Sequence, residues 1–155
     1  MDMNENTNNL VNYLVDKMAL PTITSITKML YLIELACVSS GKKPITEFKF
    51  IRYHYGPYDH QINTTLDSLV KHEDIRQEIK YLSNGEPFVV YRSNMASFDY
   101  DGPNPDIVKE FTDNLGYLSP KQLTDLAYKT KPMTRIGATL GGTEHLGDSL
   151  NLSEA

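Results

Sequence analysis

The segment from residue 26 to residue 37 constrains the fold of this chain more than any other. Its apolar side chains recur at helical spacing around most of the helix surface, at Ile26, Met29, Leu30, Leu32, Ile33, Leu35, Ala36 and Cys37. A helix that is apolar on most of its sides has to be surrounded by other elements. We therefore expect this helix to be the central one, ending at Gly41, with the rest of the 155 residues folded around it as one domain.

Shorter amphipathic helices are predicted around the central one. Their apolar residues again recur every three or four positions, in the ranges 10–18, 57–70, 105–115 and 120–127. Prolines and capping residues mark where helices begin: Thr24 or Ser25 for the central helix, Pro57 for the third, Asn104 with Pro105 for the fourth, and Ser119 with Pro120 for the fifth.

A β-hairpin is predicted between the third and fourth helices, in EIKYLSNGEPFVVYR. Two runs with strand character flank Asn84-Gly85, which is the strongest short-range hairpin signal. The expected fold class is therefore α+β and mainly α, a compact helical domain with a small antiparallel β-hairpin. Because the hairpin follows a helix, the order is winged-helix-like, and a DNA-binding transcriptional regulator is the alternative function.

The charge of the chain argues against a general nucleic-acid binder. The net charge is −5 and the pI is about 5.3, whereas such proteins usually carry a basic excess. The predicted third helix offers Asp59 and Asp67 against Lys71, which is a poor balance for contact with phosphates. The most basic stretch, residues 42–52, is explained at least as well by a solvated surface. Nucleic acid is therefore the less favoured partner.

The sequence favours a cytoplasmic protein without a membrane partner. No apolar run approaches the roughly 20 residues that span a bilayer. The first residues, MDMNENTNN, lack the basic start and apolar centre of a signal peptide. The single cysteine, Cys37, lies in the apolar helix, where we expect a small buried side chain rather than a nucleophile.

No motif for catalysis or metal binding stands out. The histidines have no spacing typical of metal ligands, at His54, His60, His72 and His145. The sequence contains no Gly-x-Ser-x-Gly motif and no phosphate-binding Gly-x-x-x-x-Gly-Lys motif. We therefore expect no enzyme, no metal and no cofactor, although a site from His54, Asp59 and His60 is chemically conceivable.

The stretch RYHYGPYDH, residues 52–60, combines aromatic and basic side chains with a Gly-Pro break. Gly56 permits a sharp backbone turn and Pro57 fixes the conformation that follows, so the stretch is predicted to be a structural corner. The alternating side chains before the break allow one pair to pack inward and the other to face outward. Tyrosine and arginine are also favoured in protein interfaces, so an exposed contact surface is the other interpretation.

Taken in order, these motifs resemble the Panacea family, also called SocA-like antitoxin domains. The resemblance begins with the central helix and continues through the lysine-proline turn to Tyr-Gly-Pro. The residues that carry it are Lys28, Leu30, Tyr31, Gly41, Lys42 or Lys43, Pro44, Ile45, Phe48, Tyr53 or Tyr55, Gly56 and Pro57. The stretch YLSPKQLTDLAYKTKPMTRIGA is similar to the closing helix of the family. Tyr128 and Met133 stand where histidine and tryptophan are commoner, so the chain is a divergent member.

The resemblance implies a compact domain that acts by binding a protein. Characterised members are antitoxins that block a toxin directly, and one type delivers its toxin to a protease. Family members occur in bacteria, phages and archaea, and no catalytic residues are established for them. The expected partner is thus a cognate toxin, with residues 1–138 as the domain and 139–155 as a flexible or partner-binding tail. The candidate partner-binding residues are Lys28, Tyr31, Arg52, His54, Tyr55 and Tyr58.

Overall fold

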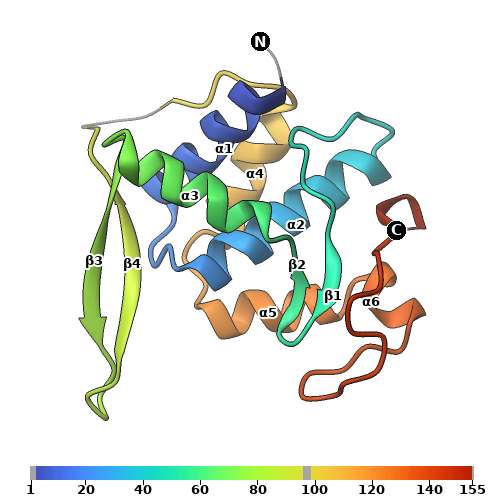
Figure 1. Ribbon diagram of the computed structural model, residues 1–155. Helices are drawn as coiled ribbons and strands as arrows, with labels where there is room; N and C mark the ends of the chain where they lie inside the picture. The colour runs from blue at the N-terminus through green and yellow to red at the C-terminus, as the bar shows by residue number, and fades with distance from the viewer. Residues whose placement is uncertain (1–2, 96–98, 155) are drawn as a thin grey trace.

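A computed structural model describes residues 3–95 and 99–154 and places one helix at the centre of the molecule (Figure 1). This helix, α2 (Ile23–Ser39), is buried at every residue from Ser25 to Leu35. The other helices are α1 (Met3–Lys17), α3 (Gln61–Lys71), α4 (Pro105–Leu115), α5 (Pro120–Tyr128) and α6 (Lys131–Arg135). Helix α2 is contacted by α1, α4 and α5, by a hairpin of residues 51–58 and by the C-terminal turn. The prediction of a central apolar helix is confirmed.

The described strands form two small antiparallel hairpins, so the mainly helical α+β fold class is confirmed. The predicted hairpin around Asn84-Gly85 consists of β3 (Ile75–Tyr81) and β4 (Pro87–Ser93). Gly85 has a φ of +89°, a conformation that suits the tight turn. Figure 1 shows this hairpin following α3 and extending along one side of the molecule.

The second hairpin corrects the predicted start of the third helix. Residues 56–58 do not open a helix: β2 (Gly56–Tyr58) pairs with β1 (Ile51–Tyr53), and Pro57 lies opposite Arg52. Helix α3 begins only at Gln61, whose backbone N–H donates to Asp59 Oδ1 at 2.9 Å. Proline suits the first turn of a helix, but here the pairing with β1 determines its conformation instead.

Two predicted helix caps are also corrected. Helix α2 is capped by Thr22 rather than by Thr24 or Ser25, and Ser25 provides the reciprocal bond of a capping box. Asn104 has left-handed backbone geometry and makes no capping bond. Its side chain donates instead to the Lys43 carbonyl at 3.1 Å, which connects α4 to the loop after α2. The predicted capping box of Ser119 at α5 is confirmed.

Residues 139–154 lie against the rest of the chain. The backbone of residues 147–150 bonds along β1: Arg52 N–H donates to the Asp148 carbonyl at 2.8 Å, and Leu150 N–H donates to the Phe50 carbonyl at 3.0 Å. Leu150 is buried, and the 3₁₀ turn η1 (Leu152–Glu154) contacts α2. The domain boundary at residue 138 and the mobility or partner binding of the tail stay predictions.

Candidate functional site

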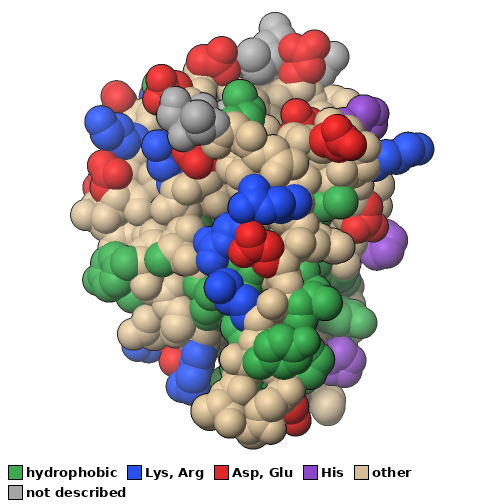
Figure 2. Space-filling view, turned by 90° about the vertical axis from the view of Figure 1, so that its left-hand side faces the viewer, with side chains coloured by type: hydrophobic (Ala, Val, Ile, Leu, Met, Phe, Trp, Pro, Cys, Tyr) green, Lys and Arg blue, Asp and Glu red, His purple; other side chains and the backbone are tan. Residues whose placement is uncertain are grey.

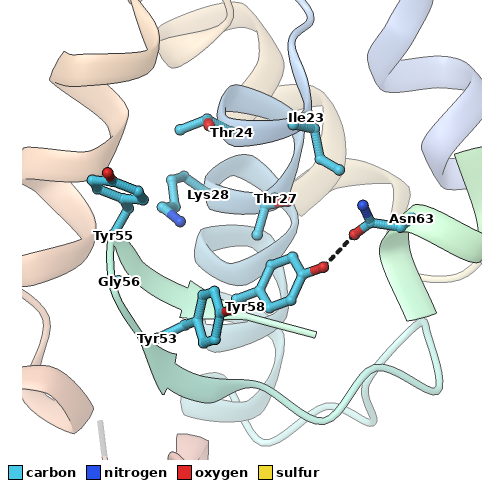
Figure 3. A pocket seen from close by; sticks show the side chains of 9 residues that line it. All are labelled: Ile23, Thr24, Thr27, Lys28, Tyr53, Tyr55, Gly56, Tyr58 and Asn63. Atoms are coloured by element: carbon cyan, nitrogen blue, oxygen red, sulfur yellow. Dashed lines mark hydrogen bonds between the residues drawn. The ribbon is translucent and has the colours of Figure 1, made fainter. Parts of the chain in front are cut away.

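The stretch RYHYGPYDH forms the β1–β2 hairpin, and a pocket of about 220 Å³ lies between this hairpin and α2 (Figure 3). We call it the tyrosine pocket. Helix α2 and the hairpin provide most of its walls, and α3 adds one side chain. The lining residues are Ile23, Thr24, Thr27, Lys28, Tyr53, Tyr55, Gly56, Tyr58 and Asn63.

Gly56 brings the hairpin close to α2. Its φ of +105° lies in a region that other residues rarely adopt. A Cβ atom there would lie 3.3 Å from Cε2 of Tyr128 and 3.5 Å from Cε of Lys28, so there is little space for a side chain. The next carbonyl, of Pro57, accepts a hydrogen bond from Lys28 Nζ at 3.0 Å. The Gly-Pro pair is thus a structural corner, and it also positions one acceptor beside Lys28.

Lys28 is the only cationic side chain that lines the tyrosine pocket. It comes from α2, and Figure 3 shows its ammonium group between Tyr55 and Thr27. The residue is only 3% exposed, and no acidic side chain pairs with it among the described residues. Burial lowers the pKa of the Lys28 ammonium from 10.5 to about 8. At neutral pH it is therefore a buried positive charge with a single protein acceptor.

Tyrosine rings form the outer wall of the tyrosine pocket. The rings of Tyr53 and Tyr58 stack with their centroids 5.1 Å apart. The Tyr58 hydroxyl donates to Oδ1 of Asn63 on α3 (Figure 3), which fixes the ring across the pocket. Partial burial raises the pKa of Tyr58, so its hydroxyl stays protonated at neutral pH. Tyr55, at the turn of the hairpin, is 69% exposed and forms the rim.

Thr27 adds a polar atom whose bonding capacity is unused. Its side chain is 1% exposed, and its hydroxyl makes no hydrogen bond within the described part of the chain. A buried hydroxyl normally has a partner. Figure 3 shows Thr27 beside Lys28 on the side of α2 that faces the hairpin. The floor of the tyrosine pocket thus carries an ammonium group with donors to spare, and the Thr27 hydroxyl beside it is closed off from solvent.

Arg52 is not on this surface, contrary to the interpretation of it as an exposed contact. Its side chain is fully buried. The guanidinium group donates to the carbonyls of Thr139 and Gly142 at 2.9 and 3.0 Å, and it lies over the Tyr128 ring. Arg52 therefore holds the C-terminal segment against the β1–β2 hairpin. Its tyrosine neighbours Tyr53 and Tyr55 face outward instead.

Tyr31 is likewise a core residue. It is fully buried, packs edge-to-face on Phe50 and shares a 2.7 Å hydrogen bond with Thr130 between α5 and α6. Burial raises its pKa to about 12. Gly41, with a φ of +77°, lies just past the end of α2 as predicted.

The structure thus brings together three of the six candidate partner-binding residues, Lys28, Tyr55 and Tyr58, in one pocket. His54 is exposed beside them on the hairpin turn. Partner binding by these side chains stays a prediction. Thr27 and Asn63 also line the pocket but were not among the candidate partner-binding residues, although Thr27 directly precedes Lys28 on α2.

A second exposed surface lies on the β3–β4 hairpin. Ile79 pairs directly with Val89, and both are exposed. Tyr81 and Leu82 continue this apolar strip toward the turn and are 68% and 50% exposed. Figure 2, which views the molecule from the hairpin side, shows hydrophobic side chains gathered beside basic and acidic ones. We call these four residues the hairpin strip.

Other kinds of site find no support in the described residues. Across residues 3–95 and 99–154, no group of three or more His, Cys, Asp or Glu side chains is placed to hold a metal ion. Within the same part of the chain, no helix is long and apolar enough to cross a bilayer. Cys37 is buried as predicted, and burial raises the pKa of its thiol.

Comparison with known proteins identifies the family. Residues 26–132 match the family described as "Antitoxin SocA-like, Panacea domain". The match extends from the first turn of α2 into α6, and it includes both hairpins and the tyrosine pocket except Ile23 and Thr24. Neither the curated proteins nor the solved structures gave a match. The chain belongs to the SocA-like antitoxin family with a Panacea domain.

Proposed function

We propose that this protein is a cytoplasmic antitoxin that binds a cognate toxin and neutralises it. The toxin would be blocked at its active surface or delivered to a protease, and the antitoxin would contribute no chemistry of its own. The observation that carries the proposal is the family match over residues 26–132, because the description of the family names an antitoxin.

Two exposed surfaces suit a protein partner. One is the rim of the tyrosine pocket, where Tyr53 and Tyr55 are 45% and 69% exposed. The other is the hairpin strip, which exposes large apolar side chains. Tyrosine supplies a large contact area with a polar end and is enriched in binding hot spots. Exposed apolar patches commonly mark interaction sites.

The first experiment is affinity purification of the tagged full chain from its native host, with and without nuclease. The proposal requires a protein that is recovered in near-equal amount and is insensitive to nuclease. That protein must arrest growth when expressed alone, and co-expression of this chain must restore growth. A captured protein that has no effect on growth would contradict the antitoxin proposal.

Tyr55→Ala tests the rim of the tyrosine pocket in the same assays. It should weaken toxin capture by roughly tenfold or more if this side chain is a hot spot. Because Tyr55 is largely exposed, its loss should leave thermal unfolding nearly unchanged. Tyr117→Ala is the matched control, since Tyr117 is 72% exposed and does not line the pocket. Equal weakening by both variants would mean that the rim has no particular role.

The alternative function, a DNA-binding regulator, draws on the order of α3 and the β3–β4 hairpin. The charges give it little support. Asp67 is exposed on α3, and Arg76 and Arg92 of the hairpin are both within ion-pair distance of Glu78. Recovery of DNA, or of partners lost on nuclease treatment, would favour the regulator. Specific duplex affinity that falls steeply with salt would support it further.

A further inference from the structure

We propose that the tyrosine pocket receives a glutamate or aspartate side chain of the partner protein, with its carboxylate bound by Lys28 Nζ. The inference rests on the proposed function, because it names the chemical group of the toxin that this surface recognises. It goes beyond the family match, which assigns no ligand to any residue of the chain.

Lys28 carries a buried charge that the described residues do not compensate. A buried charge is normally paired with an opposite charge. Lys28 is 3% exposed, yet no carboxylate of the described chain lies within ion-pair distance of it. An ammonium group has three donors, and the structure gives Lys28 one acceptor, the Pro57 carbonyl. A carboxylate from a partner would supply the missing charge and accept a remaining donor.

The wall of the tyrosine pocket offers a further donor. Asn63 accepts from Tyr58 through Oδ1, and its amide nitrogen donates to no described residue. Ammonium and amide N–H groups are both donors from which a carboxylate can accept.

The lining of the tyrosine pocket contains no competing carboxylate. None of its nine residues is acidic, and Lys28 is the only basic one. A single cation suits a carboxylate with one negative charge. Phosphate groups carry more charge and are typically bound by several cationic or backbone donors. Charge complementarity therefore favours an acidic side chain over a phosphorylated one.

The volume of the tyrosine pocket also favours a single side chain as the ligand. The pocket encloses about 220 Å³, which is below the roughly 300–1,000 Å³ of typical small-molecule sites. That space suits a single side chain of a partner better than a nucleotide or another large cofactor. The stacked rings of Tyr53 and Tyr58 provide an apolar wall for the methylene groups of glutamate or aspartate. Tyr55 at the rim would contact the neighbouring residues of the partner.

The first test uses the full chain labelled with ¹³C at the lysine side chains and observes Lys28 by NMR. The Lys28→Met variant identifies the signal by its loss. The probes are two blocked tripeptides, acetyl-Leu-Glu-Leu-amide and acetyl-Leu-Gln-Leu-amide, which differ in charge but hardly in shape. The glutamate peptide should shift the Lys28 signal saturably, and the glutamine peptide should bind about tenfold more weakly or less. Equal binding of the two peptides, or binding of neither, would overturn the proposal.

Inorganic phosphate is the competing probe. The proposal requires that phosphate displaces the glutamate peptide poorly, because one lysine does not match its charge. Phosphate that binds Lys28 more tightly than the glutamate peptide would replace the acidic side chain with a phosphorylated partner and overturn the proposal.

The second test uses the toxin recovered by affinity purification. Lys28→Met should weaken toxin binding by about tenfold or more, and changing one acidic residue of the toxin to its amide should have the same effect. Combining the two changes should add little, as expected for a contacting pair. Unchanged toxin binding by Lys28→Met would overturn the pocket inference but leave the antitoxin function intact. Failure to find any toxin would instead contradict the function, while the peptide test would still decide the pocket.

Discussion

Replacing Lys28 with methionine should stabilise the folded protein at neutral pH. Burial lowers the pKa of Lys28 from 10.5 to about 8. At 1.36 kcal/mol per pH unit, this difference corresponds to about 3 kcal/mol of stability lost while the ammonium is charged. Losing the hydrogen bond to the Pro57 carbonyl offsets about 1 kcal/mol of that gain. Methionine adapts well to an irregular apolar space, so the free energy of unfolding should rise by about 2 kcal/mol.

The gain should shrink as the pH rises from about 8 toward 10.5. In that window the unfolded chain keeps the Lys28 proton while the folded chain releases it. The unfolded state then binds more protons, so the stability of the unsubstituted protein rises with pH. Below about pH 8 both states hold the proton and the full penalty remains. Burial also raises the pKa of Tyr58 and Tyr128, but these groups are common to both proteins and largely cancel in the difference.

Urea unfolding followed by far-UV circular dichroism measures this difference directly. The two proteins are compared between about pH 7, where the lysine effect is largest, and about pH 9.5, where much of it should be lost. Lys71→Met is the matched control, because Lys71 is exposed at the end of α3 and should change stability little at any of these pH values. A Lys28→Met protein that is less stable at pH 7, or whose advantage does not vary with pH, would refute the reasoning.

Three further substitutions test the elements around the tyrosine pocket. Gly56→Ala should cost at least about 1–2 kcal/mol in urea unfolding, because φ is +105° and Tyr128 and Lys28 leave little room for a methyl group; a neutral effect would show that the hairpin moves freely. Arg52→Met should loosen residues 139–150, seen as about tenfold or faster amide exchange there than in α5; unchanged protection would mean that backbone pairing alone holds the segment. Glu34→Ala should cost about 3 kcal/mol or more, because this buried carboxylate accepts three hydrogen bonds from Ile45 and Thr46; urea unfolding within about 0.5 kcal/mol of the parent would contradict that estimate.

The elements that sequence predicted correctly are those set by local chemistry. Helix α2 is apolar on most sides, and such a helix is stable only inside a protein, so its central position followed. The turn at Asn84-Gly85 and the capping box of Ser119 depend on residues within a few positions of one another. For the turn and the capping box, the sequence contained both partners of the decisive interaction in one short window.

The errors concern interactions between distant residues. Pro57 was expected to open a helix, but its pairing with Arg52 in β1–β2 determines its conformation. Arg52 was expected on the surface, yet the carbonyls of Thr139 and Gly142 accept its donors and allow its burial. Residues from 139 onward contain few large apolar side chains, and much of their contact with the domain is made by backbone groups. Backbone carbonyls are the same for every residue type, so composition gives no sign of such a contact.

The floor of the tyrosine pocket differs from the rest of the core because it contains buried polar groups that are not fully compensated. Most α2 residues from Ser25 to Leu35 are apolar or have their polar atoms bonded, as with Glu34 and its three donors. The exceptions are Thr27, whose buried hydroxyl has no partner among the described residues, and Lys28, whose buried charge has no opposite charge among them, and each lowers stability where it stands. A leucine or methionine at either position would serve folding better. Positions that lower stability without a folding role are typical of binding sites, and both face the same pocket beneath the exposed Tyr55. Under the proposal, the carboxylate of a partner supplies the opposite charge that Lys28 lacks among the described residues.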